Sequence, residues 1–208
     1  MISAHHICIL FFIGAINADD HALSVLVENK EHISSSARLL NLSPRLLASM
    51  IYAEQSLNVR TGEETAETVL ARMGYNTSVG IAQIKLTTAV WIEHQIWNAE
   101  RGFLKKLRDK IPPSASRSEL IERLSEPSWN TLYASAYVAL IRDTWKDPLA
   151  APWNISQQAG IIGTIYSLGI LTHEGELRSV HEHPQINHFG QIALEFFDSM
   201  VLREEFPE

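Results

Sequence analysis

The sequence predicts an all-α fold, and three of its features lead to that prediction. Apolar residues recur at intervals of three and four through most of the chain, as they do at Leu47, Met50 and Ile51. The alternation of apolar and polar residues that marks strands is nearly absent. Prolines and glycines fall between the periodic segments, where they would end one helix before the next begins.

Length and composition are those of one globular domain. The chain has 208 residues, of which 46% are apolar and 20% charged, so it can bury a substantial core. Its formal net charge of -7 argues against nucleic acid as the main partner, because phosphate binding favours a basic surface. Cys8 is the one cysteine in the sequence, which excludes an intramolecular disulfide and gives no support to thiol-based redox chemistry.

The N-terminal residues differ from the rest of the chain. Residues 7–18 form an apolar run that is too short to span a bilayer and matches the core of a signal peptide. We therefore expect residues 1–18 to be a signal peptide cleaved after Ala18, and the protein to be periplasmic or secreted with no stable membrane span. Residues 19–208 are expected to form a single domain. The alternative is an N-terminal helix packed on the core, since no Lys or Arg precedes the run.

Helical periodicity begins at residue 19. Residues 19–42 are predicted to be helical, with Leu23, Leu26 and Val27 on one face and a second piece over residues 33–40.

The next predicted helix, residues 43–56, carries the main candidate for function. Ser43 is a suitable N-cap, and Pro44 suits the first helical position, where its missing N–H costs nothing. The apolar stripe of this helix, continued by four residues from Met50, reaches Glu54. An ionised, unpaired Glu on an apolar face costs several kcal/mol, so Glu54 is expected to be paired, protonated or functional. The plainer alternatives are a helix-end Glu that faces solvent, or one that is paired with an arginine such as Arg38 or Arg60.

Residues 58–77 are predicted to form a polar loop. This loop carries three acidic side chains that either line a cleft or face solvent: Glu63, Glu64 and Glu67. The remaining helices are delimited by capping residues, prolines and glycines. They are expected at about 87–107 with a bend, from Ser116 to near Pro127, and at 130–146, 155–168 and 190–206, with Gly169 as the candidate cap after 155–168. One apolar face of the helix at 130–146 is predicted to carry Tyr133, Tyr137, Leu140 and Ile141, and that of the helix at 190–206 to carry Ile192, Phe196 and Met200. Gly160 and Gly163 weaken their helix, so close packing against another helix is the expected reason for them.

Four short motifs follow one another along these elements. They are Glu54 at a helix end; Gly80-Ile81-Ala82-Gln83-Ile84, preceded by Ser78; Asn130 at the start of a helix that carries Tyr137; and Tyr166 followed by Gly169. In this order and spacing they resemble the motifs of the lysozyme-like lytic transglycosylases, the group of the soluble lytic transglycosylases and goose-type lysozyme. The resemblance covers roughly residues 36–92 and 127–169, so the core motifs lie within residues 36–169.

The resemblance implies a lysozyme-like domain with a substrate cleft for peptidoglycan glycan strands. A lytic transglycosylase cleaves these strands between MurNAc and GlcNAc and leaves a 1,6-anhydro end. Glu54 would be the general acid and then the base, and burial among apolar neighbours raises a Glu pKa in the direction that an acid needs. The residues expected to bind substrate are Ser56, Ser78, Gly80, Gln83, Asn130, Tyr137 and Tyr166.

Plainer roles remain open for several of these residues. Gln83 would suit a loop hydrogen bond, Tyr166 core packing, and Asn130 a helix N-cap. Two positions depart from the family pattern. Gln55 stands where the family has Ser, with Ser56 one residue later, and Ser167 replaces an Asn.

Other activities remain as alternatives. A hydrolytic muramidase of the inverting type would need a second carboxylate about 6.5–9.5 Å from Glu54, and the acidic loop holds the nearby candidates. A non-catalytic helical module would bind glycan or a protein partner through the same groove. In the His-rich segment 173–190, His181 and His183 would offer two imidazoles to a metal ion, but no third ligand has a diagnostic spacing. We therefore expect no metal and no cofactor.

Overall fold

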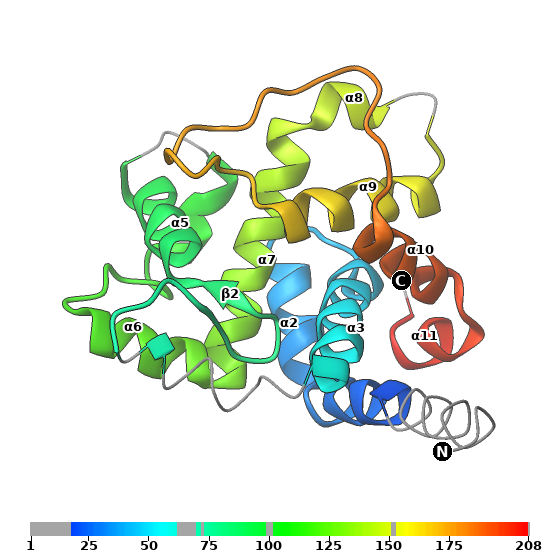
Figure 1. Cartoon of the computed structure of the whole chain (residues 1–208), viewed down its shortest axis with the longest axis horizontal. Coiled ribbons are helices and arrows are strands. Elements are labelled where there is room, and N and C mark those ends of the chain that lie inside the picture. The colour runs from blue at the N-terminus through cyan, green and yellow to red at the C-terminus, as the bar shows by residue number, and fades with distance from the viewer. Residues whose placement is uncertain (1–17, 62–69, 72, 99–101, 151–152, 208) are drawn as a thin grey trace, which may run out of the picture.

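Helix α7 (Pro127–Thr144) runs through the middle of the molecule, and the other elements are arranged around it (Figure 1). The computed structural model describes residues 18–61, 70–71, 73–98, 102–150 and 153–207. On one side of α7 lie α2 (Lys30–Leu39) and α3 (Pro44–Thr61), with α10 (His188–Asp198) and α11 (Met200–Glu205) beyond them. On the other side lie α5 (Leu86–Asn98), α6 (Arg117–Ser125) and the strands β1 (Ser78–Val79) and β2 (Ile84–Lys85). The 3-10 helix η1 (Gly102–Leu107), α8 (Lys146–Ala150) and α9 (Ile155–Leu168) complete these elements.

The predicted helical class is confirmed for the described residues, with one correction. Ser78 pairs with Lys85 and Val79 with Ile84, so the segment predicted as tight and apolar is a small antiparallel hairpin. Two residues in each strand are too few for an alternating pattern, so the sequence carries little signal for them.

Helix α7 is the buried axis of the fold. All of residues 133–141 are buried, including the rings of Tyr133 and Tyr137. The predicted apolar face is therefore correct but too narrow, because a helix packed on all sides is apolar on all sides. The helix begins at Pro127, three residues before the predicted start, and Asn130 is consequently not its N-cap.

The start of α3 is as predicted. Pro44 is its first residue, and the hydroxyl of Ser43 accepts a 3.3 Å hydrogen bond from the N–H of Leu46. Met50 is fully buried, and Glu54 follows it one turn later with its side chain partly buried. The helix continues to Thr61, five residues beyond the predicted end.

Two predictions concern the N-terminal region. Residues 18–28 are helical, with Ala22 and Leu26 buried, but Val27 is 47% exposed and does not belong to the buried face. Residues 1–17, which hold nearly all of the expected signal peptide, lie outside the described residues. Within the described part of the chain, none of the helices has the length and apolar character needed to cross a membrane.

Helices α9 and α10 pack closely through glycines. Helix α9 spans residues 155–168 as predicted, and Gly169 ends it at φ +86°. A Cβ on Gly163 would lie 3.0 Å from the Cβ of Ala193, and a Cβ on Gly190 would collide with the backbone oxygen of Gly160. The expected reason for Gly160 and Gly163 is therefore confirmed.

Two predicted helices are interrupted. The helix expected at 87–107 is α5 followed by the separate η1. The helix expected at 190–206 is divided at Ser199, whose hydroxyl accepts a hydrogen bond from the N–H of Leu202 and so caps α11. This break turns Met200 outward, and its side chain is 68% exposed rather than part of the buried face.

Candidate functional site

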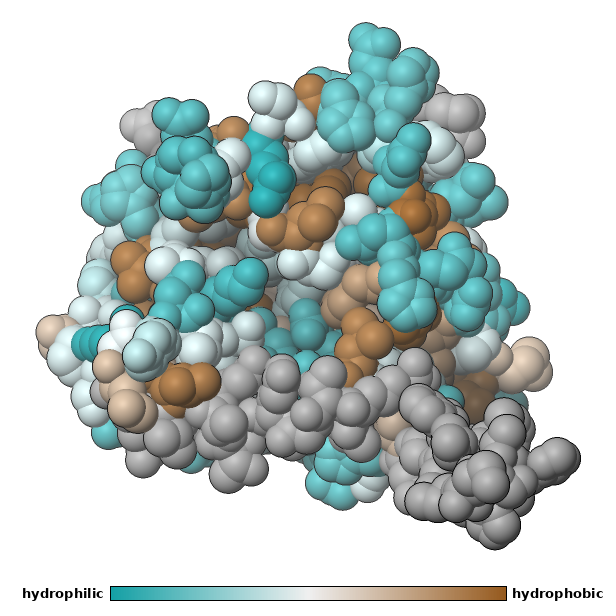
Figure 2. Space-filling view, in the orientation of Figure 1, coloured by the Kyte–Doolittle hydropathy of each residue, from teal (hydrophilic) through white to brown (hydrophobic). Residues whose placement is uncertain are grey.

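A pocket of about 180 Å³ lies where α3, the hairpin, α7 and the end of α9 meet. Figure 2 shows a hollow in this part of the molecular surface, with polar residues inside it and hydrophobic residues at its edge. Five of the residues predicted to be catalytic or to bind substrate line the pocket: Glu54, Ser78, Gln83, Tyr137 and Tyr166. These residues come from four segments that are far apart in the chain, and the fold brings them together.

Glu54 is the acidic side chain among the described residues that line the pocket. Glu54 lies on the same face of α3 as Met50, four residues earlier, which packs in the core. The helix therefore directs Glu54 toward the interior. Its negative charge acts on both pocket tyrosines, because it contributes to raising the pKa of Tyr137 and of Tyr166. Glu54 therefore lies within electrostatic reach of the two phenols.

Tyr137 and Tyr166 form the inner wall of the pocket. Their ring centroids are 5.1 Å apart at an angle of 51°. Burial is the largest cause of the raised pKa of each phenol, with Glu54 adding to it, so both hydroxyls stay protonated at neutral pH. The hydroxyl of Tyr137 accepts a 2.8 Å hydrogen bond from the N–H of Ile170, which leaves its own proton to donate elsewhere.

Gln83 and Gly80 shape the turn that joins the two strands. Gly80 has φ +79°, and a Cβ there would collide with the backbone oxygen of Leu124 and the side chain of Asn130. Gln83 has φ +46°, which is uncommon for a residue with a Cβ. Its amide nitrogen donates to the backbone oxygen of Gly80 at 3.2 Å, so its amide oxygen is the group left for a ligand. Gly80 itself does not line the pocket.

Asn130 does not line the pocket but fixes the turn from beneath. Its side chain is fully buried, and its oxygen accepts a 2.7 Å hydrogen bond from the N–H of Ala82. Its nitrogen donates to the backbone oxygens of Val79 at 2.8 Å and Leu124 at 2.9 Å. With these three bonds Asn130 is a structural residue, and the prediction that it binds substrate directly is not supported by its position.

Ser56 also lies away from the pocket. It is buried, its hydroxyl donates to the backbone oxygen of Ala53, and it borders a different cavity together with Tyr52 and His188. The three acidic candidates for a second carboxylate, Glu63, Glu64 and Glu67, lie outside the described residues.

The two departures from the family pattern have clear structural roles. Gln55 is fully buried, and its amide nitrogen donates a 2.8 Å hydrogen bond to the backbone oxygen of Ile81, which ties α3 to the hairpin turn. Ser167 lines the pocket, and its hydroxyl donates to Thr164 and accepts a 3.0 Å hydrogen bond from the amide of Asn187.

Several lining residues escaped the sequence analysis. Lys85 and Thr88 line the pocket just after the Gly80–Ile84 motif, and Phe189 lines it from α10, with its ring stacked 6.1 Å from that of Tyr166. Lys85 could have been predicted as a lining residue, because it directly follows the Gly80–Ile84 motif. Phe189 had no such signal, because it falls in the predicted His-rich segment, just before the predicted helix 190–206, and it reaches the site through the packing of α10 on α9.

A buried acid also lies outside the pocket. Glu93 on α5 accepts hydrogen bonds from the hydroxyl of Tyr133 at 2.5 Å and from the backbone and side chain of Ser114 at 2.9 Å each. Arg123 lies 3.6 Å from the same carboxylate. These partners join α5 to α7 and to the segment before α6, so Glu93 supports the side of the pocket that carries the hairpin.

The His-rich segment has no metal-binding arrangement among the described residues. No group of three or more His, Cys, Asp or Glu in that part of the chain is placed to hold an ion. His181 instead packs edge-on against Trp145, with ring centroids 5.2 Å apart.

Comparison of the chain with protein-family models and with curated proteins gave no match. The residues of the pocket and their geometry are therefore the basis for a proposed function.

Proposed function

We propose that the protein is a lytic transglycosylase with a lysozyme-like domain that cleaves peptidoglycan glycan strands between MurNAc and GlcNAc. The observation that carries the proposal is the convergence of Glu54, Gln83 and Tyr166 on one pocket, from three separate motifs that occur in the order of that enzyme group. The link between the second and last motifs supports it further, since the hydroxyl of Tyr166 donates a 2.6 Å hydrogen bond to the backbone oxygen of Ala82.

In the proposed reaction Glu54 acts twice. Its carboxylic acid gives its proton to the oxygen of the scissile glycosidic bond, and the bond from the MurNAc anomeric carbon to that oxygen breaks. The carboxylate then takes the proton from the 6-hydroxyl of the same MurNAc, whose oxygen bonds to the anomeric carbon. The product is a 1,6-anhydro end, Glu54 is protonated again, and no water is consumed.

The neighbouring groups suit a sugar substrate. The pocket combines hydroxyl groups, one amide and aromatic rings, which offer both hydrogen bonds and apolar faces to a pyranose. Tyr137 would orient the carboxylate or contact the sugar with its remaining proton. Gln83 would accept a hydrogen bond through its amide oxygen, from a sugar hydroxyl or from the N–H of an N-acetyl group.

A transglycosylase and an inverting hydrolase differ in the carboxylates that they need, since inversion requires a second one to activate water. Glu54 is the one carboxylate among the described lining residues, and the candidates for a second, Glu63, Glu64 and Glu67, lie outside the described residues. Under this proposal the protein acts in the periplasm or outside the cell, where its substrate is found. No cofactor takes part in the reaction as written.

The proposal is tested with the full chain and purified peptidoglycan. Glu54→Gln keeps the size of the side chain but removes the transferable proton, so release of soluble muropeptides should fall by at least about 100-fold. Glu122→Gln, at an exposed position of α6, is the matched control and should retain activity. A chelator should leave the wild-type rate unchanged. Glycan binding without any release by the wild type would support the non-catalytic module instead.

A further inference from the structure

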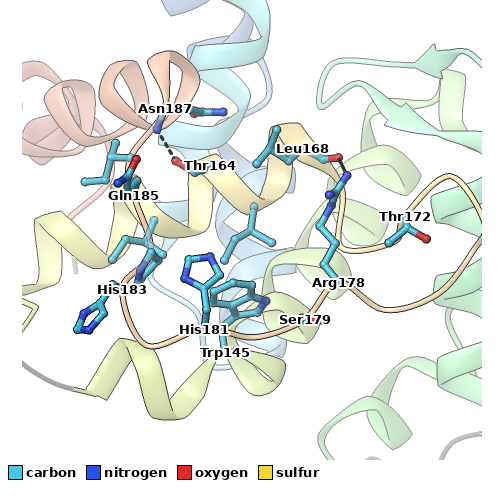
Figure 3. Close-up of a pocket in the computed structure, with 14 residues that line it drawn as sticks. Trp145, Thr164, Leu168, Thr172, Arg178, Ser179, His181, His183, Gln185 and Asn187 are labelled. Carbon is cyan, nitrogen blue, oxygen red and sulfur yellow. Dashed lines mark hydrogen bonds between the residues drawn. The ribbon is translucent and has the colours of Figure 1, made fainter.

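A larger cavity, of about 630 Å³, lies between α9, the end of α7 and the segment 172–187 (Figure 3). One wall is a face of α9 on which Ile161, Ile165 and Leu168 follow one another at helical spacing. Trp145, the residue that ends α7, adds its indole ring. This volume is within the range of pockets that hold small organic ligands, and its apolar wall suits a hydrophobic ligand body.

The segment that covers this cavity is fastened to α9 at both ends. At one end the N–H of Asn187 donates a 2.9 Å hydrogen bond to the hydroxyl of Thr164. At the other end the guanidinium of Arg178 donates to the backbone oxygens of Leu168 at 3.2 Å and Gly169 at 2.6 Å. The middle of the segment therefore spans the cavity between two fixed points.

The polar side of the cavity is made of hydrogen-bond donors and a permanent cation. Arg178, His181 and His183 line it, whereas Glu182, between the two histidines, does not. No Asp or Glu is among the described residues that line the cavity, although the chain carries a net charge of -7. The Nη1 group of Arg178 has no hydrogen-bond partner among the described residues, so the guanidinium can still bind an anion.

Two buried polar groups on lining residues lack hydrogen-bond partners among the described residues. They are the indole N–H of Trp145, a residue that is only 3% exposed, and the hydroxyl of Thr172. A buried donor without a partner costs about 1–3 kcal/mol. Both atoms are shielded from solvent in this arrangement, so a ligand that bonds either of them would also shift the covering segment.

We propose that this cavity binds a small carboxylic acid with a hydrophobic body. The carboxylate lies at Arg178, where the guanidinium supplies a charge-assisted hydrogen bond. The hydrocarbon body lies along Ile161, Ile165 and Leu168 and removes that apolar face from water. The site is separate from the Glu54 pocket, since the two are lined by different residues of α9.

The test uses octanoate as the probe and the full chain, with octan-1-ol as the uncharged ligand of equal chain length. Calorimetric titration should show octanoate binding at least about tenfold more tightly than octanol, because only the acid pairs with Arg178. Leu168→Trp fills the mouth of the cavity from a position that is 53% exposed and should weaken octanoate binding about tenfold. Val90→Trp, at an exposed position of α5, is the matched control and should not change binding.

A second measurement locates the ligand. The indole N–H signal of Trp145, assigned by its loss in Trp145→Phe, should shift when octanoate is added to the wild type. The proposal is overturned if octanoate and octanol bind equally, if Leu168→Trp binds octanoate as the wild type does, or if the Trp145 signal stays unchanged at saturation. Octanoate binding by Arg178→Gln is compared with that of the wild type only after circular dichroism shows equal helicity in the two proteins. This check is needed because Arg178 also caps α9.

Discussion

The hydroxyl of Tyr166 donates a 2.6 Å hydrogen bond to the backbone oxygen of Ala82 and so joins the end of α9 to the hairpin turn. The two residues are 84 positions apart. Because Tyr166 is buried, this bond fixes the distance between the end of α9 and the turn that carries Gln83. The shape of the candidate site therefore depends on a contact between two motifs that are far apart in the chain.

Removal of this hydroxyl should cost both stability and activity. Tyr166→Phe leaves the backbone oxygen of Ala82 buried without its partner, at a cost of about 1–3 kcal/mol in the free energy of unfolding. Muropeptide release should fall more than the small change in folded population explains, because the hairpin turn is no longer held against the end of α9. Denaturant unfolding and the release rate check both statements. Tyr75→Phe, at an exposed position, should change neither.

Asn130 is expected to be the most sensitive polar residue of the fold. Asn130→Ala removes three buried hydrogen bonds and exposes the turn to movement, so the free energy of unfolding should fall by about 3 kcal/mol or more. Asn154→Ala, which removes the N-cap of α9, should cost only about 1 kcal/mol. Equal losses in the two variants, measured by urea unfolding, would contradict the structural role given to Asn130.

The packing of α9 on α10 predicts a contrast between two glycines. Gly190→Ala places a methyl group against the backbone of Gly160, and overpacking of this kind costs about 1–3 kcal/mol. At Gly102 a Cβ meets open space, so Gly102→Ala should be close to neutral. The two melting temperatures provide the comparison, and similar values would show that α9 and α10 do not approach each other this closely.

The buried phenols predict a loss of stability at alkaline pH. The pKa values of Tyr137 and Tyr166 are raised above the ordinary value of 10.0, mainly by burial, so the folded chain retains protons that the unfolded chain releases. Their contribution is complete below about pH 10 and is lost above it, by about 1.4 kcal/mol per pH unit for each phenol. Thermal unfolding between pH 8 and 11 measures the slope. Tyr137→Phe should reduce this slope.

The sequence predicted those features whose causes are local. The cap of α3 at Ser43 and Pro44 and the limits of the helix 155–168, which ends at Gly169, depend on neighbouring residues, and both are confirmed. The 3-10 character of Gly102–Leu107 and the break at Ser199 were missed, because neither changes the apolar period by much. For the same reason Met200 was placed on a buried face that the break turns outward.

Only those residues of the candidate site that belong to a recognisable motif could be predicted. Glu54, Gln83, Tyr137 and Tyr166 were identified because their motifs resemble those of the lytic transglycosylases, and the fold brings them together. The role of Asn130 was not predictable, because its three partners lie on other elements of the chain. The sequence around Asn130 does not reveal these partners, because tertiary packing determines which groups surround a buried amide.

The most direct test of the account is mass spectrometry of the muropeptides released from purified peptidoglycan. A 1,6-anhydro end and a reducing end differ by one water, so a single spectrum distinguishes transglycosylation from hydrolysis. We predict anhydro ends from the wild type and from Glu122→Gln, and none from Glu54→Gln. Reducing ends from the wild type, or anhydro product from Glu54→Gln at the wild-type rate, would contradict the role assigned to Glu54.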